Sequence, residues 1–196
     1  MEVIRAFIAI EVPGDIPQKL VQVSEKLQAE IHLLPIRWGA VNSAHLTLKF
    51  LGDVSENNVE VLSKILEKEA ALHKPFDLSV GGLGVFPNLR KPRVLWVGVE
   101  ADDELQSLQR RIEAETARIG YAPEDHPFSA HITLGRVSRN ASQQELRDIS
   151  AAVQKLKLGF IGAGRVDAVH LFRSDLRPTG AVYTKLYSAP LTGGGS

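Results

Sequence analysis

Apolar and polar positions alternate along this chain in a way that predicts strands and helices from one end to the other. Residues 5–12 carry the β-branched and aromatic side chains of a strand. Four later segments repeat apolar residues at helical spacing, over 16–31, 59–70, 105–119 and 146–156. Further strands are expected at 36–38, 44–52, 76–80, 94–99, 130–137, 166–172 and 182–187. The pattern therefore predicts a mixed α and β protein.

Polar residues mark where several of these elements begin. Ser142 and Glu145 have the spacing of a capping box ahead of the fourth helix. Asp15 and Ser55 stand where they could cap the first and second helices.

A glycine cluster at 81–84 follows one predicted strand and allows two interpretations. It could cradle a phosphate, or it could let a strand bulge or bend. The cluster lacks the Gly-Lys-Ser/Thr ending of a nucleotide loop, and no helix pattern follows it directly. These features favour the bend.

One short motif occurs twice, at residues 44–48 and 130–134, and both copies read Ala-His-apolar-Thr-Leu. Successive side chains of a strand point to opposite faces. His45 and Thr47 are therefore expected on one face, and His131 and Thr133 on the corresponding face of the second copy. A single His-x-Thr carries little information, but two copies in matching context predict two halves of one site.

The order of elements around the motif predicts an internal duplication. Each half, roughly 1–87 and 93–192, reads strand, helix, motif strand, helix, strand. No segment has the composition of an interdomain linker. We therefore expect one bilobed α+β domain over residues 1–192, in which the two motif strands face each other across a cleft. Residues 193–196 are expected to form a flexible tail.

Composition narrows the classes of partner. The 196 residues include 23 basic and 23 acidic side chains, so no global field steers polyanions, and a nucleic acid must be met by local charge. This argues against a long duplex-binding surface. There is no cysteine, which excludes disulfides and a cysteine nucleophile and fits a cytoplasmic location. No membrane partner is expected, because no apolar run approaches spanning length and no signal-peptide pattern begins the chain.

Paired histidines and threonines suit phosphodiester chemistry. One histidine can activate a nucleophile while the other protonates a leaving oxygen, and threonine hydroxyls can hold the non-bridging oxygens. Zinc is the competing use of paired histidines, but no His-x-x-x-His spacing occurs and no acidic residue closely flanks either motif. We expect neither a metal nor another cofactor.

The paired motifs resemble the signatures of the 2H phosphoesterase superfamily, and within it the RNA 2′,3′-cyclic phosphodiesterases, historically called 2′-5′ RNA ligases. Supporting stretches lie along nearly the whole chain, at 5–10, 45–52, 81–87, 92–96 and 127–128. The resemblance implies two pseudo-symmetric lobes, with antiparallel-rich sheets lining a central cleft and helices on the outer faces.

The same resemblance implies an activity and a role for each motif residue. The expected reaction is metal-independent hydrolysis of an RNA 2′,3′-cyclic phosphate end to a 2′-phosphomonoester. Reverse use of the site, joining RNA ends through a 2′-5′ bond, is the ligase activity that named the family. By position in the family, His45 would be the proton donor to the departing 3′-oxygen and His131 the proton acceptor from water, while Thr47 and Thr133 would hold phosphate oxygens. Two pseudo-equivalent histidines can exchange roles with substrate direction.

Residues near the motifs are candidates for substrate binding. Arg136 could neutralise phosphate charge, Lys49 shares the predicted face of His45, and Phe50 could stack on a base. The other stacking candidates are Trp38, Phe86 and Tyr183, and Arg90, Lys91 and Arg93 could form a basic track. We expect a monomeric enzyme. Its expected partner is a single-stranded RNA end with a 2′,3′-cyclic phosphate, and tRNA-like fragments are included. A small cyclic nucleotide or cyclic phosphate metabolite is the alternative substrate, and a non-catalytic RNA-end binder is the third interpretation.

Overall fold

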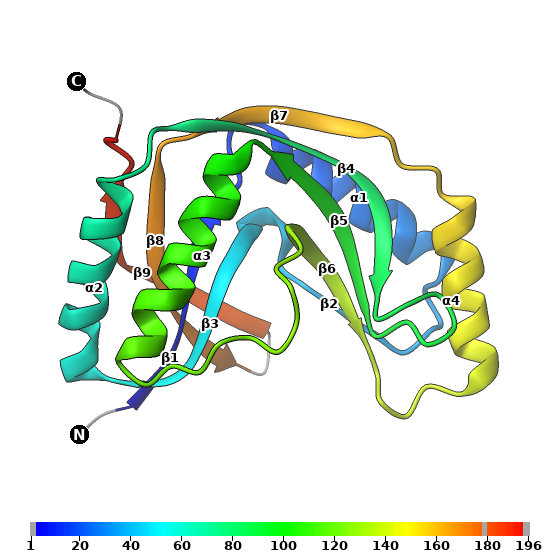
Figure 1. The fold of residues 1–196 in the computed structure, drawn as a ribbon. Helices are drawn as coiled ribbons and strands as arrows, with labels where there is room; N and C mark the ends of the chain where they lie inside the picture. Colours follow the sequence, from blue (N-terminus) through cyan, green and yellow to red (C-terminus); the bar gives the residue numbers. More distant parts are fainter. Residues whose placement is uncertain (1–2, 178–179, 194–196) are drawn as a thin grey trace.

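The computed structural model describes residues 3–177 and 180–193, which form two antiparallel sheets with helices on their outer sides (Figure 1). In chain order the elements are β1 (Val3–Glu11), α1 (Ile16–Glu30), β2 (Ile36–Trp38), the 3-10 turn η1 (Val41–Ser43), β3 (His45–Ser55), α2 (Glu56–Ala70), β4 (Phe76–Phe86), β5 (Val94–Ala101), α3 (Asp103–Arg118), β6 (His131–Val137), α4 (Gln143–Lys155), β7 (Phe160–Val166), β8 (Ala168–Arg177) and β9 (Gly180–Pro190). The α+β prediction is confirmed. No helix within the described ranges is long and apolar enough to cross a membrane.

The two sheets repeat one strand order. Sheet A runs β3-β1-β8-β9 and sheet B runs β2-β6-β5-β4-β7. In each sheet the motif strand lies next to the first strand of its half, so β3-β1-β8 corresponds to β6-β5-β4. The sheets do not coincide with the sequence halves 1–87 and 93–192, because each half supplies strands to both sheets: β2 and β4 join sheet B, and β8 and β9 join sheet A. Among the residues that the structure describes, strand β2, at the edge of sheet B beside β6, has no counterpart beside β3.

Helices α1 and α3 each pack against the sheet to which the preceding strand does not belong. Helix α1 follows β1 of sheet A but contacts β7 and α4 on sheet B, whereas α3 follows β5 of sheet B but contacts β3 and α2 on sheet A. Figure 1 shows α2 and α3 together over sheet A, and α1 and α4 together over sheet B. Each sheet is therefore covered by one helix from each half of the sequence.

Most buried apolar side chains lie between the sheets and their helices. The helices bury the stripes that their sequence periodicity predicts, with Leu20 and Leu27 of α1 and Leu62 and Leu66 of α2 fully buried. A second, smaller cluster lies on the other face of sheet A and consists of Phe7, Ala9 and Phe172 with Tyr183 against them. Sheet A is therefore covered by apolar side chains on both faces around β1.

The predicted helix caps differ in whether their side-chain hydrogen bonds form. The capping box at Ser142 and Glu145 is present in both directions, whereas Asp15 and Ser55 occupy N-cap positions without a side-chain bond to the helix. Strand β7, which the sequence did not predict, contains glycines at 162 and 164 whose Cβ atoms would collide with Ile16 and Pro13. The glycines are there because the start of α1 lies directly on that strand.

Two further predictions concern the glycine cluster at 81–84 and the tail at 193–196. Strand β4 runs straight through the glycine cluster, with a register shift between Gly81 and Leu83 and a positive φ of 70° at Gly82. The bulge is thereby confirmed. At the predicted tail, the Gly193 N–H donates to the His73 carbonyl at 2.8 Å, and residues 194–196 lie outside the described residues.

Candidate active site

The two histidine motifs lie where the sheets approach each other. His45 is the first residue of β3, the edge strand of sheet A, and His131 is the first residue of β6, next to the edge of sheet B. Strands β3 and β6 contact each other, and the short η1 turn carries the chain from β2 of one sheet into β3 of the other. Figure 1 shows β3 and β6 in the middle of the molecule, between the two helix pairs. We call the face of each sheet that carries His and Thr its motif face.

Each histidine is oriented by a backbone carbonyl two residues before it. Nδ1 of His45 lies 3.4 Å from the Ser43 oxygen, and Nδ1 of His131 lies 2.7 Å from the Ser129 oxygen. A carbonyl oxygen only accepts, so the bond forms when Nδ1 carries the proton. In both neutral rings Nε2 is then the atom free to take up a proton.

Aromatic rings surround His45. Its ring centroid lies 4.6 Å from that of Phe7, 4.9 Å edge-on from that of Tyr183, and 6.1 Å from that of Phe172. Burial among these rings lowers the pKa of His45, and the bond to the Ser43 carbonyl opposes that effect. The neutral form of His45 is favoured accordingly.

His131 has aromatic neighbours and, in addition, a charged one. Phe86 meets its ring edge-on at 4.9 Å, and Trp96 lies 6.4 Å away. Burial lowers the pKa of His131, the Ser129 carbonyl opposes this, and the positive charge of Arg136 lowers the pKa further. Arg136 is therefore close enough to act on the histidine of its own motif.

The same bulge interrupts both motif strands just after the threonine. In β3, Thr47 pairs with Ala9 and Lys49 with Ile8, which leaves Leu48 as the extra residue. In β6, Thr133 pairs with Trp96 and Gly135 with Leu95, which leaves Leu134 as the extra residue. A bulge reverses the alternation of the residues beyond it. Phe50 and Arg136 consequently return to the motif face, in equivalent positions.

The prediction that Lys49 shares the face of His45 is wrong, and the bulge is the reason. Lys49 is 2% exposed, and its ammonium donates to Glu113 Oε1 at 2.7 Å and to the Ala122 carbonyl. Glu113 also accepts from the Glu124 N–H at 2.8 Å and from Gln109 at 3.1 Å. The buried pair thus fastens the bulge of β3 to α3 and to the loop that leads into β6.

The other predicted binding residues divide by face. Phe50 is 56% exposed on the motif face, with its ring 6.4 Å from that of Phe7. Phe86 and Tyr183 border the histidines, whereas Trp38 pairs with Gly135 on the opposite face and packs against the core. In the proposed basic track, Arg93 donates to the Ser138 carbonyl at 2.6 Å. Arg90 and Lys91 bond through their backbone N–H groups to Asn88 and are exposed.

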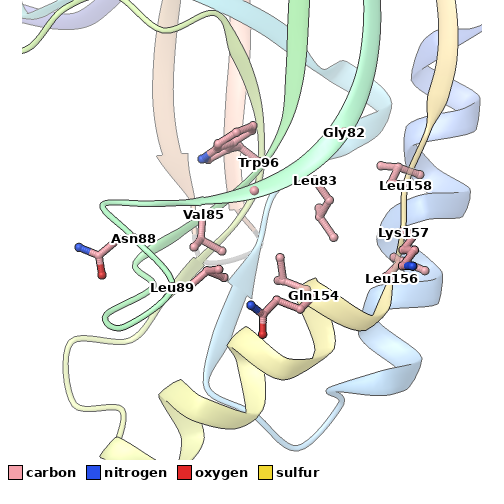
Figure 2. Close-up of a pocket in the computed structure, with 12 residues that line it drawn as sticks. Gly82, Leu83, Val85, Asn88, Leu89, Trp96, Gln154, Leu156, Lys157 and Leu158 are labelled. Carbon is pink, nitrogen blue, oxygen red and sulfur yellow. The ribbon is translucent and has the colours of Figure 1, made fainter.

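The glycines of β4 make room for Trp96. A Cβ atom on Gly84 would lie 2.3 Å from the indole ring, so the ring lies flat over the strand at that point. Figure 2 shows Trp96 on one side of β4, with Leu83 and Val85 on the side toward α4. That second side borders a cavity of about 610 Å³, whose lining includes Leu83, Trp96 and Gln154 but neither motif histidine. The cavity is thus separate from the paired histidines.

Several residues that the sequence did not single out lie on the motif face of sheet A. Phe7 and Phe172 touch His45, and the strand at 5–12, apolar on both faces, was a signal that both faces are covered. Glu11 is paired across from His45 and binds Lys185 at 2.8 Å. His170 Nε2 lies 3.6 Å from the same carboxylate, and nothing in the sequence marked that proximity.

Within residues 3–177 and 180–193, no three His, Cys, Asp or Glu side chains are grouped to hold an ion.

Most of the chain matches a known family. The model of the 2′-5′ RNA ligase superfamily matches residues 19–178. The chain belongs to that superfamily. Two relatives, both described as RNA 2′,3′-cyclic phosphodiesterase, are 31% identical to it. The one from Methanothermobacter thermautotrophicus aligns over 93% of this chain and 96% of its own length. The one from Thermotoga maritima aligns over 97% of each.

Two solved structures share the fold of this chain. TT0787 of Thermus thermophilus superposes with a TM-score of 0.78 at 28% identity, covering 96% of this chain and 98% of that protein. E. coli LigT complexed with 3′-AMP gives a TM-score of 0.76 at 26% identity, covering 97% and 99%. The resemblance inferred from the paired motifs is confirmed.

Proposed function

We propose that this chain hydrolyses the 2′,3′-cyclic phosphate at an RNA end to a 2′-phosphomonoester. The observation that carries the proposal is the matched anchoring of His45 and His131, which leaves Nε2 of each free on the motif faces of two touching strands. Full-length relatives described as RNA 2′,3′-cyclic phosphodiesterase support it.

The proposed reaction is an in-line displacement with proton transfer at both ends. Neutral His131 takes a proton from water through Nε2 as the water oxygen bonds to phosphorus. The bond from phosphorus to the 3′-oxygen breaks, and protonated His45 gives its proton to that oxygen. Thr47 and Thr133 donate hydrogen bonds to the non-bridging oxygens. The products are a 3′-hydroxyl and a 2′-phosphate, and proton exchange between the histidines and solvent completes the cycle.

The charge of Arg136 supports this division of roles. A base must be neutral before the reaction and an acid must be protonated. Arg136 favours neutral His131, and no cationic side chain contributes to the pKa shift of His45. Burial lowers the pKa of both histidines, and the charge of Arg136 is the one further cause that favours His131 as the base.

Arg136 and Phe50, equivalent in the two motifs, complete the proposed substrate site. The guanidinium would neutralise phosphate charge, and the exposed ring of Phe50 would stack on a base of a single-stranded RNA end. Lys49 is not part of this proposal, because its ammonium is bound to Glu113. We further propose, from the sequence alone, a monomeric cytoplasmic enzyme that needs no cofactor.

End-group analysis of a short RNA with a 2′,3′-cyclic phosphate tests the function. The RNA is incubated with excess chelator and wild type, His45→Ala or His131→Ala, beside His32→Ala as a matched control on an exposed histidine. We expect a 2′-phosphate product. Its rate of formation should fall by about 10²-fold to 10⁴-fold in either motif variant and should be unchanged in the control. A 3′-phosphate product, turnover abolished by the chelator, or full activity in either motif variant would overturn the proposal.

A further inference from the structure

Two arginines face each other beside the second motif. Arg37 of β2 pairs directly with Arg136 of β6, so the two side chains share one face of sheet B. That face is the motif face, because Arg136 pairs with Val94 and Thr133 pairs with Trp96 two residues along β5. Both arginines are exposed. Neither forms an ion pair with any carboxylate in the described ranges 3–177 and 180–193.

This pairing differs from other charged positions on the sheets. Arg5 is opposite Asp53 on β1 and β3, and Arg165 is opposite Asp77 on β7 and β4, where the ion pair measures 3.4 Å. Like charges directly opposite each other on neighbouring strands are destabilising. An anion between Arg37 and Arg136 would convert that repulsion into two attractions.

We propose that Arg37 and Arg136 together bind a second phosphate, the phosphodiester adjacent to the terminal cyclic phosphate of the RNA. The inference rests on the proposed function and deepens it, because it assigns an oligonucleotide as the preferred substrate. Each guanidinium can donate two parallel N–H bonds to phosphate oxygens.

The order of residues along the sheet supports this location. Arg136 lies three residues beyond Thr133 across the bulge, which is roughly 10 Å or less along the strand, and Arg37 lies one strand further out. Arg136 is therefore between the reacting phosphate and Arg37. A strand of RNA that leaves the histidines along β6 meets Arg136 first and Arg37 next.

An alternative role for the exposed Arg37 is to protect the edge of sheet B from pairing with another molecule. Strand β2 is at the edge of sheet B, and a charged side chain on an edge strand hinders pairing with another molecule. That role predicts no effect of Arg37 on substrate preference.

The test compares two substrates in Arg37→Gln. One is a nucleoside 2′,3′-cyclic monophosphate, which has only the reacting phosphate, and the other is a trinucleotide that ends in the same cyclic phosphate. We expect kcat/KM to fall about tenfold for the trinucleotide, the effect of one lost charge-assisted contact, and to stay within about twofold for the mononucleotide. Arg37→Lys should lie in between, because lysine keeps the charge but not the planar fork. The matched control is Arg147→Gln, on the exposed surface of α4.

Binding gives a readout that does not depend on turnover. The affinity for a labelled trinucleotide with a terminal phosphate is measured against salt. Removal of one phosphate contact should reduce the log–log slope by about 0.7 in Arg37→Gln. An equal loss on both substrates, or an unchanged preference and slope, would overturn the second-phosphate site. Failure of the wild type to turn over either substrate would refute the proposed function instead, while the salt slope would still decide the role of Arg37.

Discussion

In β3 and in β6 the chain builds the same backbone: a histidine held by the carbonyl two residues earlier, an apolar residue, a threonine, and then a one-residue bulge. Beyond the bulge the two strands differ. The buried position is Lys49 in β3 and Gly135 in β6, and the position that returns to the motif face is Phe50 in β3 and Arg136 in β6. The two motif strands thus share one backbone arrangement but carry different side chains at equivalent positions.

The difference shows how a duplicated motif can serve two roles in one reaction. Phe50 adds an apolar surface beside a histidine already enclosed by Phe7 and Tyr183. Arg136 adds a positive charge that favours the neutral form of its histidine. Strand β2, present only beside β6, covers Gly135 and brings Arg37 into register. The phosphates of an RNA end would therefore meet most of their positive charge on the side of the base.

The largest expected effect concerns the buried pair that fastens the β3 bulge. Lys49→Met leaves the mostly buried carboxylate of Glu113 without its cation, and the free energy of unfolding should fall by about 3 kcal/mol or more. Activity should fall as well, since the pair also holds the loop that leads to His131. Urea denaturation and the turnover of cyclic-phosphate RNA measure the two effects.

Two variants make this prediction specific. Lys64→Met breaks an exposed Lys–Glu pair of similar length, 2.6 Å to Glu60, and should change the free energy of unfolding far less, because water screens an exposed pair. The double variant Lys49→Met/Glu113→Leu should recover part of the stability, because no unpaired carboxylate remains. Equal costs at Lys49 and Lys64 would show that the buried pair does not anchor the bulge.

The second prediction compares the equivalent positions Arg136 and Phe50. Arg136→Gln should weaken binding of an RNA end by about 1–3 kcal/mol, because a charge-assisted contact to phosphate is lost. Phe50→Leu should weaken binding by a similar amount, but it should leave the salt dependence unchanged. Titration of a labelled RNA end at several salt concentrations separates the two. Identical salt slopes in both variants would contradict the assignment of charge to one side.

The third prediction disturbs one half of the site through its packing. Gly84→Ala places a methyl group against the ring of Trp96, and overpacking of this kind costs about 1–3 kcal/mol. The surroundings of His131 should change while those of His45 do not, as NMR titration of the two imidazoles would report. Gly159→Ala, with nothing within 4 Å of the added Cβ, is the matched control and should change neither imidazole.

The sequence was sufficient for the elements that depend on a long periodic pattern. Helical stripes predicted the helices. Strand alternation predicted that each motif histidine shares a sheet face with its threonine, which agrees with the register of β3 and β6. Strand β7 escaped prediction because its glycines interrupt the apolar alternation, and they are explained only by the start of α1 lying on that strand.

Lys49 shows why the rest of the site could not be predicted. Strict alternation puts it beside His45 and puts Phe50 in the core, and a single extra residue reverses both. A bulge leaves no mark in the pattern of apolar residues, because Leu48 is apolar in either arrangement. The partner of Lys49 is equally hidden, since Glu113 lies on a helix that belongs to the other half of the sequence.

The most direct test of unequal roles is the pH dependence of kcat/KM in wild type, Arg136→Gln and Phe50→Leu. In this account the acidic limb reports the pKa of the base His131, which Arg136 lowers. Removal of the charge should raise that pKa and move the acidic limb to higher pH. The shift should be small, because an exposed charge is screened. The alkaline limb should stay in place, and Phe50→Leu should move neither limb. An alkaline limb that moves instead would make His131 the acid and contradict the account.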